Sequence, residues 1–473
     1  MGMQRWGNKS KSLLVLSNYL LGEASVKILA IIFIPVITRL VTPADYGYIS
    51  IYIGVLSLMS IVLPLNLPAS LRPRFLKHPT GYSSYAGTIL VCSLLFSLIL
   101  FLILFTRADV ISSYFKIPLQ FLKISLVSSL ILIVKEVYQK VLLSKGESGK
   151  YAKFLTFYTL SEYVLTILLI LYISQNKYLG KGFASIINSI LFLVFSFHQL
   201  QKHVNWGLSF KYLKHAILFS LPLIIHATSH FILAQFDRLI INQLINSEST
   251  GFYSLAYSTG SLLMVIISAV NHYWLPTFFK SLKSGDVVPL NNKLQVLSGL
   301  VMFSAFLLTI FSGEIILILA PEEYSGASKI IPIIVLANVF IYMYMLFANY
   351  SFFSGKTLVI AVNTSLAGLV NIILNYCYIP RYGIIAAAYT TLVSYMLLFV
   401  LHFLCTFLIY KEFPRLKIGP VFFKLAIFVL ITVLLNFILP FFDNYLKYLI
   451  KIIVSIIIGI SLFWKLRLNH FFQ

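Results

Sequence analysis

Apolar residues gather along this chain in long runs, and short polar segments separate one run from the next. Each run is close to the ~20 residues that a helix needs to cross the hydrocarbon core of a bilayer. Fourteen such runs lie near residues 13–37, 46–66, 85–106, 120–143, 153–174, 181–200, 215–236, 252–275, 293–319, 329–350, 358–378, 384–409, 420–440 and 447–466. No connection exceeds about 20 residues, which leaves no room for a folded domain outside the membrane. The pattern predicts an all-α integral membrane protein with about 14 transmembrane helices.

The composition excludes a water-soluble fold. Hydrophobic residues make up 59% of the 473 positions and charged residues only 11%, against about a quarter in a soluble domain. The net charge of +22 would favour a nucleic-acid partner in a soluble protein, but here the side on which the charges lie matters more. With the N-terminus placed inside, 23 of the 36 lysines and arginines fall on the cytoplasmic side and 9 on the other. Both termini are therefore predicted to be cytoplasmic, and no nucleic acid is expected as a partner.

The chain contains an internal repeat. The segment Tyr46–Ser50 recurs as Thr250–Ser254, an offset of 204 positions, and two further matches follow in order at offsets of 206 and 203. Six helices per repeat is an even number, so both repeats enter the membrane from the same side and are parallel. The predicted organisation is an N-lobe of helices one to six (1–210), a C-lobe of helices seven to twelve (211–412), and two extra helices with a cytoplasmic tail (413–473).

Four stretches of sequence carry a family resemblance. They are Pro35–Pro43 leading into Tyr46-Gly47, Leu221-Pro222 followed by Asp237-Arg238 and Gly251–Ser254, Gln139–Tyr151, and Tyr382–Ala388. In these residues the chain resembles bacterial polysaccharide repeat-unit flippases of the O-antigen type, in the multidrug/oligosaccharidyl-lipid/polysaccharide exporter superfamily. The resemblance implies that undecaprenyl-pyrophosphate-linked oligosaccharide moves across the bacterial cytoplasmic (inner) membrane by alternating access. It also implies contact with membrane lipids and leaves open an association with polysaccharide polymerase machinery.

Charged residues inside spans are candidates for a transport site, because a sugar pyrophosphate needs a hydrated and preferably cationic path through hydrocarbon. Glu23 and Lys27 are four residues apart on one face of the first helix, close enough to pair. They either neutralise each other and join two helices or line a cavity between the lobes. Lys135 and Glu136 in the fourth helix and Glu162 in the fifth form a second group, for which a structural network and a functional one are equal alternatives.

The first and seventh helices carry further candidates. Arg39 lies at the outer end of the first helix, where it either snorkels to lipid phosphate or contacts the pyrophosphate. Asp237 and Arg238 occupy the matching end of the seventh helix, and Asp237 follows His226 and His230 by eleven and seven residues, nearly in line. With Glu23, this stripe could hold a proton or a cation and couple transport to an H⁺ or Na⁺ gradient, although helix packing is the stronger interpretation of two histidines. Neither a resident cofactor nor a metal site is expected.

Polar residues near the cytoplasmic side and in the second half also have two interpretations. Arg72, Arg74 and Lys77 either collect the anionic lipid carrier or act as topology determinants, and the second alternative is favoured. Helices ten to twelve contain a set of Asn and Tyr side chains that could bind sugars or hydrogen-bond between helices. This set is Asn338, Asn349, Asn363, Asn371, Asn375, Tyr342, Tyr344 and Tyr389.

Enzyme motifs such as a Walker A loop or a His-Glu-x-x-His site do not occur, so the protein is not expected to be an enzyme. A multidrug exporter or a peptidoglycan-precursor exporter of the same superfamily is the main alternative. A drug-cation exporter would favour a net negative cavity, whereas the buried lysines of this chain favour an anionic substrate. A membrane polysaccharide polymerase would need a sizeable outer loop with catalytic groups, and the short outer loops argue against it.

Overall fold

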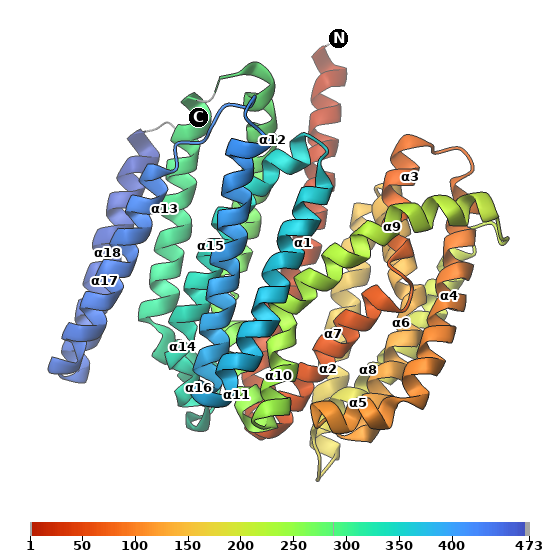
Figure 1. Cartoon of the computed structure of the whole chain (residues 1–473), viewed down its shortest axis with the longest axis horizontal. Coiled ribbons are helices and arrows are strands. Elements are labelled where there is room, and N and C mark those ends of the chain that lie inside the picture. The colour runs from red at the N-terminus through yellow and green to blue at the C-terminus, as the bar shows by residue number, and fades with distance from the viewer. Residues whose placement is uncertain (1, 287, 469–473) are drawn as a thin grey trace. The chain divides into compact units, whose positions relative to one another are not determined.

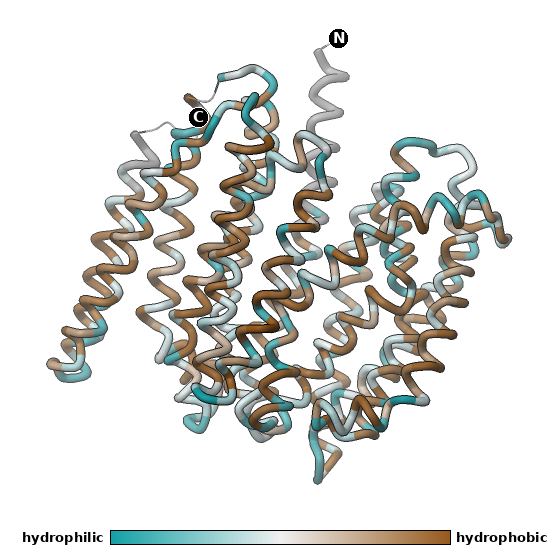
Figure 2. The backbone as a smooth tube through the Cα atoms, viewed as in Figure 1, coloured by the Kyte–Doolittle hydropathy of each residue, from teal (hydrophilic) through white to brown (hydrophobic). Residues whose placement is uncertain are grey.

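The computed structural model describes residues 2–286 and 288–468, and within these ranges every regular element is a helix. Twelve helical stretches of this part are long and apolar enough to cross a membrane. In Figure 2, apolar residues colour the middle of the helices, and hydrophilic residues gather at their ends and in the connections. The prediction of an all-α, multi-pass membrane protein is confirmed.

Two features reconcile these twelve stretches with about fourteen spans. The 52-residue stretch α16 (Thr357–Leu408) contains one non-helical residue, Gly383, with a φ of 66° that side-chain-bearing residues rarely adopt. It therefore bends into two arms, which the hydrogen bond between Thr390 and Asn375 joins. The 27-residue helix α6 (Leu119–Lys145) is also long enough to span, but several charged residues, including Lys135 and Glu136, interrupt its apolar sequence.

By their contacts the residues divide into two compact units, 1–251 and 252–473. The α-helices of the first unit are labelled in Figure 1. The unit holds α1 (Gly2–Leu40), α2 (Pro43–Val62), η1 (Leu67–Ser70), α3 (Leu71–Lys77), α4 (Tyr82–Thr106), α5 (Ala108–Phe115), α6, α7 (Ser148–Tyr172), α8 (Tyr178–Leu200), α9 (Phe210–Phe231), the π-helical η2 (Ile232–Phe236), α10 (Asp237–Leu244) and the start of α11 (Ser247–Gly260). Its boundary lies beyond α9 and α10 because α9 packs on α2 and α4, and α10 packs on α2 and α5. The predicted lobe boundary at residue 210 describes the sequence repeat and stays a prediction.

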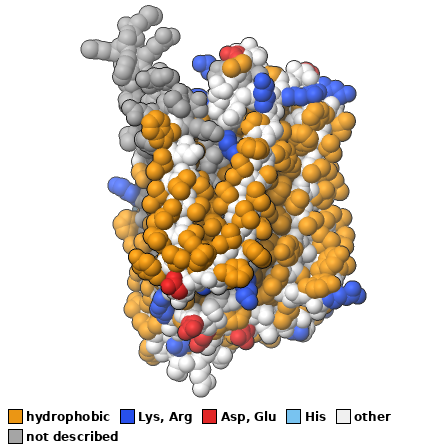
Figure 3. All heavy atoms as spheres, turned by 90° about the vertical axis from the view of Figure 1, so that its left-hand side faces the viewer, with side chains coloured by type: hydrophobic (Ala, Val, Ile, Leu, Met, Phe, Trp, Pro, Cys, Tyr) orange, Lys and Arg blue, Asp and Glu red, His pale blue; other side chains and the backbone are white. Residues whose placement is uncertain are grey.

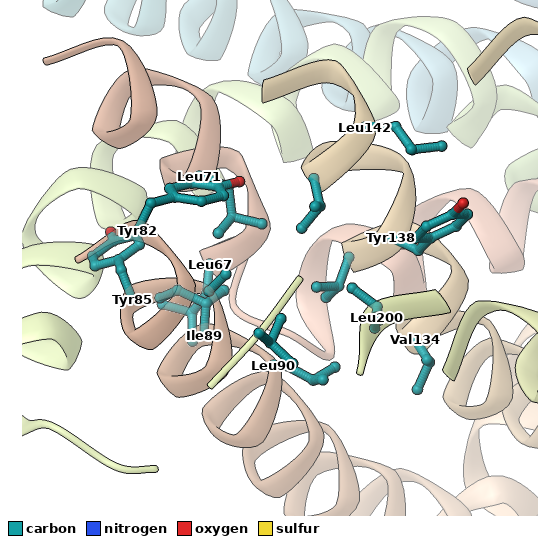
Figure 4. Close-up of a cluster of buried hydrophobic side chains, with 14 of the residues drawn as sticks. Leu67, Leu71, Tyr82, Tyr85, Ile89, Leu90, Val134, Tyr138, Leu142 and Leu200 are labelled. Atoms are coloured by element: carbon teal, nitrogen blue, oxygen red, sulfur yellow. The ribbon is translucent and has the colours of Figure 1, made fainter. Parts of the chain in front are cut away.

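Apolar side chains at helical spacing form the core of the first unit. On α6, Val134, Val137, Tyr138 and Val141 recur at intervals of three and four, so they share one face and are buried together. Figure 4 shows this face meeting side chains of η1, α3, α4 and α8. This core holds together α3, α6 and α7, which carry the candidate charges Arg72, Arg74, Lys135, Glu136 and Glu162.

The order of elements repeats along the chain. Helices α2 and α11 begin at Pro43 and Ser247, and the eight-residue helices α5 and α14 (Ser312–Leu319) begin at Ala108 and Ser312. Both pairs have the offset of 204 positions found in the sequence motifs. The repeat is therefore present in the secondary structure as well as in the residues.

The second unit holds the rest of α11, α12 (Leu263–Ser284), α13 (Val288–Ile310), α14, η3 (Glu322–Lys329), α15 (Ile331–Phe353), α16, α17 (Gly419–Ile438), η4 (Leu439–Phe441) and α18 (Asn444–Leu468). Helix α15 packs on α16, whereas α17 and α18 pack on α13. The ion pair of Lys451 Nζ with Glu314 Oε1, 2.5 Å apart, also ties α18 to α14. Figure 3 shows the α17–α18 side as a broad apolar band with charged side chains at its margins, as expected of a surface that faces lipid.

Candidate functional site

A buried ion pair joins α7 to α8 in the first unit. Glu162 forms a salt bridge with Lys181, and each side chain is only 10% exposed. Glu162 also accepts hydrogen bonds from Ser185 Oγ at 2.7 Å and from Asn188 Nδ2 at 2.9 Å. Both carboxylate oxygens are thus bonded, which compensates the cost of placing charge in the interior.

A second lysine extends this group from α6. Lys135 Nζ lies 4.0 Å from the centre of the Tyr158 ring, and Tyr158 is one turn before Glu162 on α7. Glu136 and Glu162 are both near enough to attract the Lys135 ammonium electrostatically. The structure therefore brings the predicted group of Lys135, Glu136 and Glu162 together within one unit. We call the set of Lys135, Glu136, Tyr158, Glu162, Lys181, Ser185 and Asn188 the polar cluster.

Lys181 is a member of this cluster that was not singled out from the sequence. The residue is one turn inside α8 and only 8% exposed. The reason is its pairing with Glu162, a partner on another helix. A sequence signal was present, since Lys181, Ser185 and Asn188 follow the i, i+4, i+7 spacing of one helical face.

Glu23 and Lys27 lie along the seam between α1 and α7. Tyr151 of α7 donates a hydrogen bond of 2.8 Å to Glu23 Oε1, and Ser25 and Thr156 share another of 2.7 Å. The ion pairs of the described residues do not include the predicted one between Glu23 and Lys27. Glu23 is exposed and Lys27 half-buried, so the two charges have different surroundings although they share a helix face.

Arg39 lies at the end of α1 and is exposed. Its Nη1 donates a 3.0 Å hydrogen bond to the carbonyl oxygen of Pro35, one turn earlier in the same helix. The neighbouring Leu40 carbonyl accepts a 2.9 Å hydrogen bond from Lys177 Nζ. The end of α1 is therefore a cationic site built from two side chains, of which the sequence analysis singled out only Arg39.

The seventh span is not the regular α-helix that its apolar pattern predicts. The π-helical turn η2 lies between His230 and Asp237, and a π turn takes up more residues than an α turn. This shifts the register, so the predicted line of His226, His230 and Asp237 is not kept: His230 is exposed, whereas Asp237 is 1% exposed. Arg238, also buried, donates through Nη1 to the Ala234 carbonyl at 3.0 Å and to Gln235 Oε1 at 2.6 Å, both within the π turn.

The two arginines of the short helix α3 differ in their surroundings. The Arg74 guanidinium lies 5.5 Å from the centre of the Tyr85 ring and 5.9 Å from that of Tyr212, and its Nη1 donates to the His78 carbonyl at 2.8 Å. Arg72 is exposed. Of the three predicted carrier contacts, Arg74 joins α3 to α4 and α9, whereas Arg72 and Lys77 are presented at the surface.

Most of the Asn and Tyr set of the second unit is engaged within the protein. Four of the Asn side chains, at positions 338, 349, 363 and 375, donate to groups on neighbouring turns or helices. Tyr342 shares a 3.0 Å hydrogen bond with Ser298, and the Tyr344 ring stacks on His402. Tyr389 differs from these residues because it is 53% exposed. Hydrogen bonds between helices or between the two arms of α16 therefore account for Asn338, Asn349 and Asn363, whereas Asn375 donates one turn back along its own arm.

The sequence of this chain matches that of a known protein family. Residues 36–329, which include the whole polar cluster, match the family model described as "Polysaccharide biosynthesis protein". This chain belongs to that family. The resemblance identified in the sequence is thereby confirmed.

Two proteins of Haemophilus influenzae are similar in sequence. "Lsg locus putative protein 1" is 24% identical over 396 residues, which cover 78% of this chain and 93% of that protein. An "uncharacterized membrane protein" is 26% identical over 365 residues, 72% of this chain and 84% of that one.

Solved structures of transporters share the fold. The lipid II flippase MurJ in an inward closed conformation has a TM-score of 0.72 at 15% identity and covers 95% of this chain and 98% of its own. An inward-facing multidrug resistance MATE transporter has a TM-score of 0.61 at 13% identity, over 83% and 96% of the two chains. At this identity the likeness shows the fold alone.

Proposed function

We propose that this protein moves undecaprenyl-pyrophosphate-linked oligosaccharide repeat units from the inner to the outer leaflet of the bacterial inner membrane by alternating access. The observation that carries the proposal is the match of residues 36–329 to the polysaccharide biosynthesis family in a chain with the transporter fold. In this proposal both termini are cytoplasmic, as the charge bias predicts, and polymerase machinery on the outer side receives the product.

Charge supports an anionic substrate. A pyrophosphate carries about two negative charges, and a well-placed Lys or Arg contact contributes about 1.5–3 kcal/mol. Lys27 and Lys135 are half-buried within the first unit, and Arg39 and Arg72 are exposed at helix ends. These groups favour the pyrophosphate whatever sugar it bears.

Transport can be tested with the purified full chain in proteoliposomes that contain a lipid-linked oligosaccharide. A membrane-impermeant glycosidase reports how much sugar has reached the outer surface. We expect faster exposure of sugar with the protein than in empty liposomes, activity retained in Lys27→Arg, and activity lost in Lys27→Gln. Lys202→Gln, at an exposed position outside the helices, is the matched control. Equal rates with and without protein would refute the proposed function, and full activity of Lys27→Gln would refute the role of its charge.

A peptidoglycan precursor is the second candidate substrate, because the lipid II flippase shares the fold with a TM-score of 0.72. The same assay with lipid II separates the two candidates. Rescue of flippase-deficient cells by this chain, with a polysaccharide repeat unit in one strain and lipid II in another, gives the answer in vivo.

Energy coupling is a separate part of the proposal. Glu23, His226, His230 and Asp237 are the titratable candidates for coupling to an H⁺ or Na⁺ gradient. Collapse of each gradient in turn with an ionophore, in the same proteoliposomes, would identify the coupling ion. A rate that neither ionophore changes would exclude coupling to both gradients.

A further inference from the structure

The bend of α16 creates a cleft within the second unit. Gly383 separates the two arms of this helix, and a cleft of about 510 Å³ opens between them. All of the residues that line it belong to α16: Leu374, Tyr378, Tyr382, Ile385, Ala386, Tyr389, Thr390 and Val393. Its volume is within the range of about 300–1,000 Å³ that is typical of small-molecule sites.

Three tyrosines give the cleft its chemistry. Tyr378, Tyr382 and Tyr389 are 47%, 65% and 53% exposed, and the first two rings are 6.3 Å apart. Within the described part of the chain, none of their hydroxyls has a hydrogen-bond partner. Each tyrosine therefore offers an apolar ring face and an unused polar tip.

Buried hydrogen bonds behind these rings join the two arms of α16. Thr390 donates to Asn375, which donates in turn to Asn371 at 3.0 Å. Asn371 and Asn375 are fully buried. The second arm is thus anchored to the first, and Tyr389, next to Thr390, is presented from a fixed backbone.

A groove on α17 provides a comparison within the same molecule. It has a similar volume, about 480 Å³, and it is lined by Phe422, Leu425, Ala426, Val429, Leu430 and Val433. These side chains bear no hydroxyl, which suits an acyl chain. The α16 cleft is also mainly apolar, but it differs from the α17 groove because three phenol hydroxyls lie in its lining, so it suits a ligand with both apolar faces and hydroxyl groups.

We propose that the α16 cleft binds a pyranose ring of the oligosaccharide. One C–H face of the sugar stacks on the ring of Tyr389 or Tyr382, and sugar hydroxyls hydrogen-bond to the phenols. This inference rests on the proposed function and assigns the sugar-binding part of it to α16. The tyrosines contribute preference among sugars.

Saturation-transfer NMR on the full chain in nanodiscs tests the cleft directly. The probes are free methyl β-D-glucopyranoside, methyl α-D-mannopyranoside and N-acetylglucosamine. We expect transfer to the C–H protons of at least one sugar, reduced about fivefold in Tyr389→Leu and Tyr382→Leu and less in Tyr389→Phe, which keeps the ring. Tyr445→Leu is the matched control, because Tyr445 is a 77% exposed tyrosine on α18 outside the cleft.

The outcomes separate this inference from the proposed function. Sugar transfer that is unchanged in Tyr389→Leu and Tyr382→Leu overturns the inference, and so does transfer from these tyrosines to lipid acyl chains alone. If the wild type flips lipid-linked oligosaccharides and Tyr389→Leu flips every sugar at the same relative rate, the cleft is excluded while the function stands. If the wild type flips none, the proposed function fails whatever the sugar binding. If Tyr389→Leu does not fold, Tyr389→Phe takes its place in the test, because it keeps the ring and removes only the hydroxyl.

Discussion

Gly47 and Gly251 pack backbone against backbone where α2 meets α11. A Cβ atom on Gly47 would lie 2.0 Å from the carbonyl oxygen of Ser247, and one on Gly251 would lie 2.0 Å from that of Pro43. Both glycines and both contacted residues are related by the repeat offset of 204, so the two contacts are reciprocal. The repeat motif therefore marks a close helix contact that tolerates no side chain.

This contact gives a first prediction. Gly47→Ala and Gly251→Ala should each destabilise the protein by about 1–3 kcal/mol or more, because backbone must move to admit the methyl group. Thermal unfolding of the detergent-solubilised chain measures the effect. Gly54→Ala is the control in the same helix, since a Cβ atom there would meet nothing within 4 Å. Equal stability of the Gly47 and Gly54 variants would contradict the close contact.

The Glu162–Lys181 pair gives a second prediction. Glu162→Gln leaves the Lys181 ammonium buried without its counterion, and we expect a loss of about 3–5 kcal/mol in stability. Lys181→Met should cost a similar amount by stranding the carboxylate. The double variant should cost clearly less than the sum, because it removes both charges. A double-mutant cycle on unfolding temperature measures this coupling, and strictly additive effects would show that the pair does not interact.

Arg72 and Arg74 should separate function from stability. Arg74→Gln removes the contacts with two tyrosine rings and the hydrogen bond to the His78 carbonyl, and we expect it to cost about 1–2 kcal/mol in stability. Arg72→Gln should leave stability unchanged and slow the transport of lipid-linked oligosaccharide. Protein level and flipping rate, measured on the same samples, test both parts. An Arg74→Gln variant as stable as the wild type would contradict the predicted loss of stability. A normal flipping rate in Arg72→Gln would contradict its predicted role in transport.

The contact between Lys145 and His203 predicts a response to pH near the ends of α6 and α8. Lys145 Nζ lies 2.8 Å from His203 Nδ1, which accepts the hydrogen bond only while the imidazole is neutral. Burial, followed by the Lys145 charge, lowers the pKa of His203 below its usual value near 6.5, while Glu147 opposes this shift. The unfolded chain then binds the proton more readily, so the contact stabilises the fold above pH 6.5 and is lost as the pH falls through the lowered pKa.

Hydrogen exchange measures this response. Amide protection of residues 200–204 should fall between pH 7.5 and 5.5, after correction for intrinsic exchange rates. His203→Gln keeps an acceptor that does not titrate in this range, so its protection should not change with pH. A wild-type profile as flat as that of the variant would rule out the contribution of His203.

Several elements were predictable because they depend on local pattern. A run of about 20 apolar residues has few alternatives to a membrane helix, so the spans follow from hydropathy alone. Even α6, whose charges interrupt its apolar sequence, was predicted from the apolar run near 120–143. The repeat was readable because the glycines at 47 and 251 are required by contact and therefore recur at a fixed offset.

Side-chain partners were less predictable because they depend on which helices become neighbours. Glu23 has a possible partner at Lys27 one turn away, yet it accepts a hydrogen bond from Tyr151, which is 128 residues distant. Asp237 was aligned with His230 on the assumption of a regular helix, and a π turn shifted the register. Neither outcome has a signature within the helix concerned.

Local sequence was enough to identify a helical membrane protein of repeated halves, because burial of apolar residues in lipid and the spacing of helix ends depend on residues close together in the chain. Tertiary structure alone decided which charges are compensated. The sequence gives no sign that Glu162 of α7 pairs with Lys181 of α8, and it does not distinguish Arg74, which contacts two tyrosine rings of other helices, from the exposed Arg72. The physical reason is that the free energy of a charge in a membrane depends on the groups that surround it, and helix packing selects those groups from distant parts of the chain.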